Sequence, residues 1–177
     1  MTQQTVRAAL ERVISVLGAR PDAGKKPTSF ATAVWGDGLS CKVTGPRGES
    51  AHTDMPKPMG GEGSAPTPGW YLNAAIASCA ATGIAARASV QGIELEAVEV
   101  TVNSQSDARG LLGITDVTAA MTDLKMNVVL SSKNATASQL EALVLWVEAH
   151  SPVSGALRAG ASPAVEVQVH PAQTSVR

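Results

Sequence analysis

The segment from Gly60 to Arg87 constrains the fold more than any other part of this 177-residue chain. A loop rich in glycine and proline leads there into a long run of small and apolar residues, with no charge before Arg87. Thr67 suits the N-cap and Pro68 the first helical position, so the run predicts a helix over 68–90. Because few of its side chains are large, neighbouring elements can pack closely on several sides. We therefore expect a central helix.

Cys79 lies in the middle of this predicted helix and raises the main functional question. Free cysteine is among the most often buried residue types, so inert packing is one interpretation. The other is a placed reagent, but nothing local activates it. Cys79 lies about three turns past the helix start, too far for the helix dipole to act on it. Arg87 lies two turns further along, too far to reach the thiol. A reactive thiolate would need a cation from another element or another subunit.

Charge and composition argue against several classes of function. The formal net charge is -1 and the 14 lysines and arginines are scattered, so no nucleic acid partner is expected. Residues 70–86 are uncharged but too short and too rich in alanine for a membrane span. Arg7, Glu11 and Arg12 stand where a signal peptide has its apolar run. We expect a cytoplasmic protein with no membrane contact and two reduced thiols.

The remaining patterns predict helices and strands in blocks. Gly36-Asp37-Gly38 is a hairpin signal, and Thr136 with Gln139 forms a capping-box pattern. Such an order is typical of an α+β domain with mainly antiparallel sheets packed on two core helices. The expected helices cover 3–18, 68–90, 136–150 and 153–158. The expected strands cover 29–35, 39–44, 50–53, 93–104 with a phase adjustment near Ala97, 121–131, and a closing strand through Val165, Val167 and Val169.

Other reactive residue types carry weaker signals. Cys41 lies in a predicted strand and is expected at its core or edge, and a disulfide to Cys79 is geometrically possible but unsupported. The three histidines share no metal-ligand spacing, so neither a metal nor a cofactor is expected. Ser64 lacks the G-x-S-x-G motif of a serine hydrolase. The glycine-rich run 60–63 lacks a P-loop lysine and a dinucleotide fingerprint, which leaves a flexible loop.

Two motifs stand in a specific order and spacing along the chain. A glycine-rich loop leads into x-Pro-x-x-x-Leu-x-x-Ala-x-x-x-Cys, and a later helix ends in x-Pro-Val before a final strand. The residues of these motifs are Pro68, Leu72, Ala75 and Cys79, then Ser151, Pro152 and Val153. In this order and spacing they resemble the OsmC/Ohr family. The resemblance covers residues 29–169 and implies an OsmC-like fold, with antiparallel sheets around two central helices in an intertwined homodimer. The chain then divides into an N-terminal helix and linker (1–28), an OsmC-like domain (29–170) and a C-terminal tail (171–177).

The resemblance also implies a chemistry. In the family, the thiol on the first long helix attacks a peroxide and becomes a sulfenic acid. A second cysteine just before Pro-Val then condenses with it to a disulfide. An arginine from the N-terminal sheet and a glutamate near the helix start orient the thiolate and the peroxide. Cys79 is therefore the expected catalytic residue of a thiol-dependent peroxidase that reduces organic hydroperoxides.

This chain departs from the family pattern at three places. Ser151 stands where the second cysteine belongs, and a serine cannot form a disulfide. Gly69 and Trp70 occupy the acidic positions after the helix-start proline, and the first hairpin turn lacks the arginine. Arg47 in the next turn and Glu62 in the preceding loop are the expected substitutes. These changes predict a weak one-cysteine peroxidase that needs an external thiol reductant.

Two alternatives stay open. One is a redox-inactive OsmC-like dimer that binds a small apolar ligand, with Trp70 and Tyr71 lining the pocket. The other is a structural or interaction dimer with no small-molecule partner. The sequence names neither a substrate nor a reductant.

Overall fold

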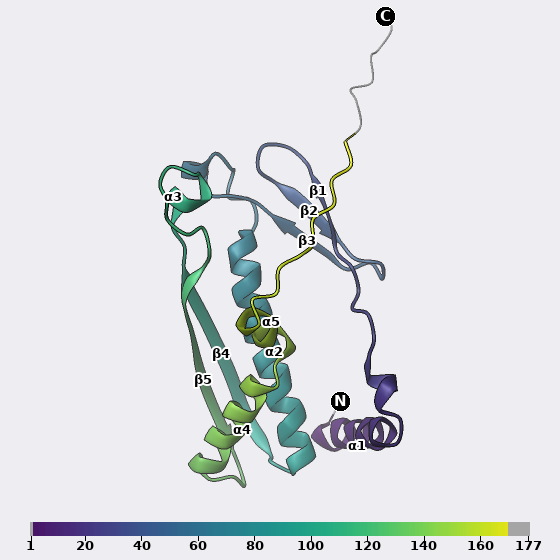
Figure 1. The fold of residues 1–177 in the computed structure, drawn as a ribbon. Helices are drawn as coiled ribbons and strands as arrows, with labels where there is room; N and C mark the ends of the chain where they lie inside the picture. The colour runs from purple at the N-terminus through teal and green to yellow at the C-terminus, as the bar shows by residue number, and fades with distance from the viewer. Residues whose placement is uncertain (1, 170–177) are drawn as a thin grey trace, which may run out of the picture.

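The computed structural model describes residues 2–169. A single long helix, α2 (Pro68–Gln91), stands at the centre of the molecule (Figure 1). It begins as predicted, because the Thr67 hydroxyl accepts a hydrogen bond from the amide of Trp70 at 3.2 Å. It ends at Gly92, whose φ of 71° is a left-handed conformation that glycine adopts without strain. The predicted central helix is confirmed.

The hydrophobic core lies between α2, a β-hairpin and helix α4 (Ala137–Ala149). The hairpin pairs β4 (Leu95–Gln105) antiparallel with β5 (Thr122–Ser132). Ile84 and Leu143 are 0% and 2% exposed, and burying such a side chain stabilises the fold by about 1.5–3 kcal/mol. Ala88 and Val147 complete the buried centre, and the partly buried residues around it are Ile93, Leu95, Val98, Val100, Val128, Leu130, Leu140 and Val144.

Strand β4 shows the alternation that its sequence predicts. Val98, Val100 and Val102 are half-buried, whereas the residues between them are exposed. The register shifts between Leu95 and Ala97, which confirms the expected phase adjustment. At the other end of the hairpin, Asp107 caps the short helix α3 (Ala108–Leu111).

A second, smaller sheet covers the N-terminal end of α2 (Figure 1). Its antiparallel strands are β1 (Thr32–Trp35), β2 (Cys41–Thr44) and β3 (Ser50–Thr53), in that order across the sheet. The first strand is shorter than expected and begins at Thr32. The sheet is tied to the helix by Tyr71, whose hydroxyl donates to the carbonyl of His52 at 3.0 Å. The 3₁₀ turn η2 (Lys57–Met59) lies in the loop between β3 and α2.

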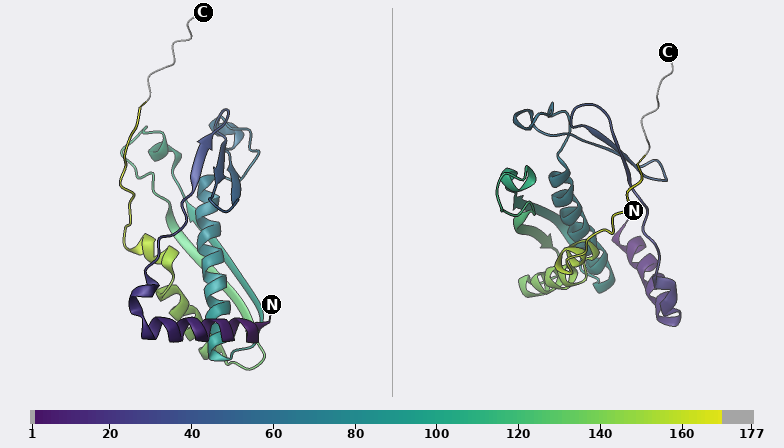
Figure 2. Two further views of the ribbon diagram at one scale, coloured as in Figure 1. Left: turned by 90° about the vertical axis from the view of Figure 1, so that its right-hand side faces the viewer. Right: turned by 45° about the horizontal axis from the view of Figure 1, so that its top comes forward.

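The predicted N-terminal helix is present as α1 (Gln3–Ala19), followed by the 3₁₀ turn η1 (Pro21–Gly24). It crosses the C-terminal end of α2, and Figure 2 shows this crossing from a second side. No residue of α1 is fully buried, and Val13 and Ile14 are about half exposed. Within the described residues, no helix has both the length and the apolar character that a membrane crossing requires.

The closing strand predicted through Val165, Val167 and Val169 is wrong. After α5 (Pro152–Arg158) the chain forms no regular structure up to Val169, and these three valines are 79%, 77% and 83% exposed. Alternation makes a segment suitable for a strand, but a strand needs a neighbouring edge to pair with. The described residues of one copy offer this segment none. The predicted tail, 171–177, lies outside the described residues.

Candidate functional site

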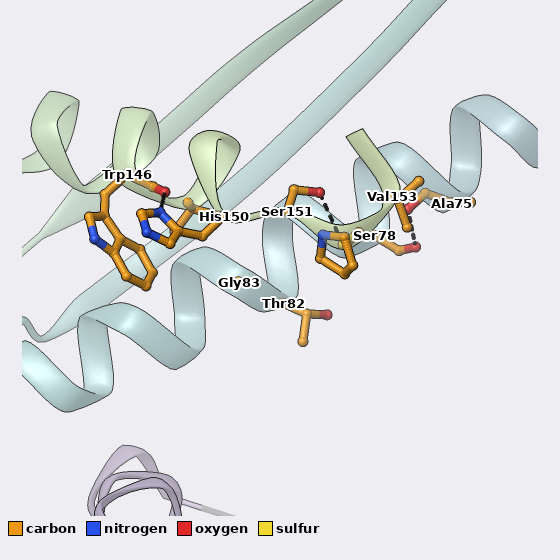
Figure 3. A pocket seen from close by; sticks show the side chains of 11 residues that line it. Ala75, Ser78, Thr82, Gly83, Trp146, His150, Ser151 and Val153 are labelled. Carbon is orange, nitrogen blue, oxygen red and sulfur yellow. Dashed lines mark hydrogen bonds between the residues drawn. The ribbon is translucent and has the colours of Figure 1, made fainter. Parts of the chain in front are cut away.

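Cys79 lies in a groove between α2 and the corner that joins α4 to α5. The groove has a volume of about 580 Å³ and is drawn in Figure 3. Helix α2 contributes mainly small side chains to its wall, and the α4–α5 corner contributes larger ones. The lining residues are Ala75, Ser78, Cys79, Thr82 and Gly83 from α2, and Trp146, Val147, His150, Ser151, Pro152 and Val153 from the corner.

Gly83 sets how closely the two helices approach. It lies one turn after Cys79 on the same face of α2. A Cβ atom at this position would lie only 2.6 Å from Cγ1 of Val147, closer than real Cβ contacts allow. The absence of a side chain therefore lets α4 pack directly on α2. Gly83 is the one residue that interrupts the helix-forming run, and its function is this close packing.

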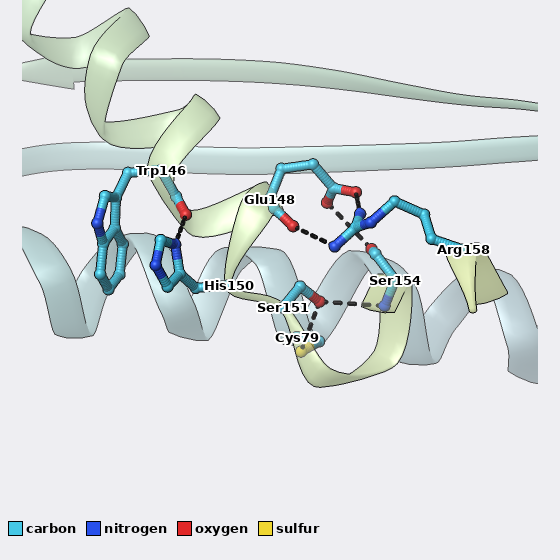
Figure 4. A network of polar contacts seen from close by, with 7 residues as sticks. All are labelled: Cys79, Trp146, Glu148, His150, Ser151, Ser154 and Arg158. Carbon is cyan, nitrogen blue, oxygen red and sulfur yellow. Dashed lines mark hydrogen bonds and ion pairs between the residues drawn. The ribbon is translucent and has the colours of Figure 1, made fainter. Parts of the chain in front are cut away.

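The close approach brings Ser151 to Cys79. The two side chains are 72 residues apart in sequence, and Oγ of Ser151 lies 3.4 Å from Sγ of Cys79 (Figure 4). Ser151 is 6% exposed and is the N-cap of α5, where its Oγ accepts from the amide of Ser154 at 3.2 Å. Cys79 is half-buried. The serine at the position of the family's second cysteine thus touches the sulfur.

Three hydrogen bonds, one of them an ion pair, hold the corner behind Ser151 in place. Glu148 accepts from the Ser154 hydroxyl at 3.0 Å and from Arg158 at 2.6 Å, and Arg158 also donates to the Glu148 carbonyl at 3.0 Å (Figure 4). Sequence reasoning missed these three residues. The signal available was the Ser-Pro-x-Ser pattern at 151–154, which is typical of a capped helix start.

An aromatic stack forms the far end of the groove. The rings of Trp146 and His150 lie 3.9 Å apart and nearly parallel, and Nδ1 of His150 donates to the Trp146 carbonyl at 2.7 Å. The Arg87 guanidinium lies 4.1 Å from the centre of the Trp146 ring, in a cation–π contact. Arg87 follows Cys79 by eight helical positions, roughly 12 Å along the axis. Arg87 therefore supports the tryptophan and does not reach the sulfur.

The four residues expected to bind the substrate or ligand lie away from this groove. Arg47 is exposed and donates to Glu49 at 2.9 Å in its own hairpin turn. Trp70 packs edge-on against Tyr71, with ring centres 5.1 Å apart, and Tyr71 bonds to β3. The backbone amide of Glu62 donates to the carboxylate of Asp54 in the same loop. Within the described part of one copy, the groove lining contains no Lys, Arg, Asp or Glu.

Cys41, the second thiol, lies on β2 opposite Trp35 and Thr53. Both cysteines are free, so no disulfide joins them. Between residues 2 and 169, no three or more histidine, cysteine, aspartate or glutamate side chains gather in a way that could hold a metal ion.

A buried carboxylate organises the loop before α2, for which the sequence predicts flexibility. Asp54 is 2% exposed and accepts hydrogen bonds from three backbone amides and one hydroxyl. The donors are the amide of Met55 at 2.7 Å, that of Glu62 at 3.1 Å, that of Ser64 at 2.9 Å and the Ser64 hydroxyl at 2.8 Å. The two bonds from Ser64 are the main reason that the pKa of Asp54 lies below its ordinary value of 3.8. The glycine-rich loop is therefore pinned.

Comparison with known proteins now places the chain. The family model described as OsmC-like protein matches residues 61–166, more than half of the sequence. The chain belongs to the OsmC-like protein family. The match contains both Cys79 and Ser151, and it begins after α1 and the β1–β3 sheet. The predicted family and the predicted α+β, OsmC-like fold are confirmed.

Solved structures agree with this assignment. The crystal structure of an organic hydroperoxide resistance protein OsmC from Legionella pneumophila is 28% identical, covers 76% of this chain and 91% of that chain, and has a TM-score of 0.56. An OsmC-like protein from Mycoplasma pneumoniae is 15% identical over 76% of this chain and 89% of that chain, with a TM-score of 0.65. An organic hydroperoxide resistance protein of Bacillus subtilis is 20% identical, covers 75% of this chain and 91% of that chain, and has a TM-score of 0.50. No curated protein matches the chain.

Proposed function

We propose that this protein is a thiol-dependent peroxidase that reduces organic hydroperoxides through Cys79. The observation that carries the proposal is the half-buried thiol in an open groove, with the Ser151 hydroxyl 3.4 Å from its sulfur. The site lies on the helix where the family pattern has its reactive thiol. The relative from Legionella pneumophila, an organic hydroperoxide resistance protein, supports the same class of substrate.

The reaction needs only the sulfur and an external thiol. The Cys79 thiolate attacks the terminal oxygen of the hydroperoxide, an S–O bond forms and the O–O bond breaks. Sulfur loses two electrons, and the alkoxide takes up a proton and leaves as the alcohol. Ser151 cannot condense with the resulting sulfenic acid. A low-molecular-weight thiol therefore forms a mixed disulfide with Cys79 and releases water, and a second molecule of that thiol frees Cys79 and leaves as the disulfide.

We expect this peroxidase to be weak, because the thiolate is the nucleophile and the groove lining of one copy contains no lysine or arginine to stabilise it. In this proposal an arginine from a second copy, with Arg47 as the candidate, is what would raise the rate. The cytoplasm, where small thiols are kept reduced, is the compartment in which the reductant is available.

A homodimer is part of the proposal. Phe30 and Trp35 are 67% and 70% exposed near the small sheet, and Leu145 on α4 is 70% exposed. Large apolar side chains exposed on these elements are what contact with a second copy would cover. Sedimentation at micromolar concentration should give a dimer of the 18.1 kDa chain, and a stable monomer would exclude the dimer.

A second candidate function is binding of a small apolar ligand without redox chemistry. Its support is the lining of the groove, which is mainly apolar and includes Trp146, Pro152 and Val153. Such concave apolar sites with a few polar groups are typical of ligand pockets. Trp70 and Tyr71, the residues expected from the sequence to contact the ligand, do not line the groove. We therefore place the ligand against the residues that do line it.

A peroxide-consumption assay with several small thiols separates the two candidates. We expect the wild type to consume cumene hydroperoxide, Cys79→Ser to lose this activity, and Cys41→Ser to keep it. Cys41→Ser is the matched control because it removes the other thiol, which lies outside the groove. Consumption that survives in Cys79→Ser would refute the peroxidase. No consumption by the wild type, together with saturable binding of a fluorescent apolar probe, would favour the binding protein.

A further inference from the structure

Among the described residues, the hydrogen-bonding pattern of Ser151 gives its proton one protein acceptor, the sulfur of Cys79, and an ionised sulfur can only accept. A hydroxyl has one proton to donate and two lone pairs with which to accept. The amide of Ser154 donates to Oγ of Ser151 at 3.2 Å and so occupies one lone pair. Within residues 2–169, the one acceptor that the structure places beside this hydroxyl is Sγ of Cys79, at 3.4 Å. Because Ser151 is 6% exposed, water competes little for the proton.

We propose that Ser151 is a positioning residue for Cys79, and that its hydroxyl donates to the sulfur. The inference rests on the proposed function, because it concerns how the thiolate is held for attack on a peroxide. A hydrogen bond to an ionised acceptor is roughly twice as strong as one between neutral groups, so this bond favours the thiolate over the thiol. In a groove whose lining has no lysine or arginine, this donor replaces part of what the missing arginine would supply.

The surrounding packing holds this geometry. Contact between Gly83 and Val147 sets the distance from α2 to α4. The network of Ser154, Glu148 and Arg158 then fixes the turn from α4 into α5. The bond from the Ser154 amide further restricts the rotamer of Ser151. The hydroxyl therefore meets the sulfur without an additional ordering cost during the reaction.

Ser151 also determines the fate of the oxidised sulfur. When the sulfur carries an oxygen, the same hydroxyl remains within reach of the sulfenic acid and can bond to it, but it cannot displace that oxygen as a thiol would. The residue that stabilises the reduced sulfur thus also leaves the oxidised sulfur open to a thiol from the groove. This role differs from that of a cysteine at the same position, which consumes the sulfenic acid itself.

The test measures alkylation of Cys79 by iodoacetamide at neutral pH, followed at this residue by mass spectrometry. Alkylation requires the thiolate but no peroxide, so it is independent of the proposed activity. We expect Ser151→Ala to slow alkylation about tenfold or more, and Ser151→Thr, which keeps the hydroxyl, to restore it to within about threefold. Thr136→Ala is the matched control, because it removes the N-cap of α4 without touching Cys79 and should react like the wild type.

Ser151→Gly guards against a folding defect. Glycine caps a helix almost as well as serine, so this variant removes the hydroxyl with little loss of stability, and it should be as slow as Ser151→Ala. Alkylation of Ser151→Gly at the wild-type rate would overturn the inference. Failure of Ser151→Thr to recover would also overturn it, because a role in packing alone would then account for the loss. If the wild type consumes no peroxide while the alkylation rates differ as expected, the proposed function fails, and the hydrogen bond from Ser151 to the thiolate is still supported.

Discussion

Asp54 lies in the loop before α2 and Cys79 lies on α2 itself, yet the carboxylate has four hydrogen-bond donors and the sulfur has one neighbouring hydroxyl. Asp54 is closed off by its own loop, and no further donor is needed there. Cys79 faces an open groove and keeps its capacity for a new partner. The polar cluster around Asp54, just before the start of α2, is therefore structural. The thiol of Cys79, in the middle of α2, remains accessible to a reaction partner.

Glycines set the close approaches in both regions. At the Asp54 loop, a Cβ on Gly61 would overlap the carbonyl oxygen of Met55. At the groove, a Cβ on Gly83 would meet a side chain, Cγ1 of Val147, at 2.6 Å. The backbone of the loop cannot move away easily, whereas a valine side chain can be shortened. The loop is therefore the less tolerant of the two regions, and the groove is the one that can be redesigned.

The largest change should come from giving Cys79 a covalent partner. In Ser151→Cys a second sulfur would take the place of an oxygen 3.4 Å from Sγ, so stoichiometric hydroperoxide should convert nearly all of the protein to the 79–151 disulfide. In the wild type, Cys79 should instead end as a sulfenic acid, a mixed disulfide or a sulfinic acid. Peptide mass spectrometry distinguishes these products. A Cys41–Cys79 crosslink as the main wild-type product would contradict the one-cysteine mechanism.

Gly61→Ala tests the loop. We expect it to reduce the free energy of unfolding by about 3 kcal/mol or more, because the added methyl group overlaps backbone and disturbs the donors to Asp54. Urea denaturation measures the loss. Gly18→Ala is the control, since a Cβ at Gly18 on α1 meets nothing within 4 Å, and it should leave stability unchanged or slightly raised. Equal stability of the two variants would show that the loop is not rigid.

Gly83→Ala tests the groove and should have a smaller effect. The overlap with Val147 should cost about 1–3 kcal/mol and should move Ser151 away from Cys79, so alkylation of the thiol should slow as well. In the double variant Gly83→Ala/Val147→Ala the overlapping atoms are gone, and the alkylation rate should recover. If the rate does not recover, Gly83 does not control the distance between the helices.

How much of this could be read from the sequence depended on whether the signal was local. The start of α2 at Thr67, the capping box at Thr136 and the register change near Ala97 all rest on a few neighbouring residues, and all were predicted. The contact between Ser151 and Cys79 spans 72 residues, and only the family resemblance pointed to it. The closing strand at Val165 was predicted from local alternation alone, which cannot show whether a partner strand exists.

The candidate site was predicted in part for the same reason. Cys79 and Ser151 follow from the motif positions. Trp146 and His150 line the groove because the end of α4 packs against α2, and no local pattern in the sequence predicts that packing. Asp54 gave no signal, since its four donors lie up to ten residues further along an irregular loop. The expectation for Arg47 and Glu62 rests on their positions in the sequence alone. The structure gives them partners in their own turn and loop.

The loss of stability at low pH, here called the acid limb, gives the smallest expected effect. The lowered pKa of Asp54 means that the unfolded state binds its proton more readily than the folded state does. The stabilisation from this carboxylate is therefore fully present about one pH unit above its unfolded pKa of 3.8. It is lost as the pH falls through the lower pKa of the folded state. The pKa of Glu49 is also lowered, by hydrogen bonds from the backbone amides of Glu49 and Arg47. The pKa of Asp107 is lowered by the Arg109 side chain. Both groups therefore contribute to the loss of stability at low pH.

In Asp54→Asn we expect lower stability at neutral pH and a shallower decline between about pH 5 and pH 2, because one titrating group is gone while the other two remain. Urea midpoints across this range measure both effects. The matched control is Asp107→Asn, a partly exposed group whose loss should flatten the limb with less effect at neutral pH. The groove carries no carboxylate, so Ser151→Gly should leave the shape of the acid limb as in the wild type. A wild-type acid limb in Asp54→Asn would show that the buried carboxylate is not the feature that stabilises the loop.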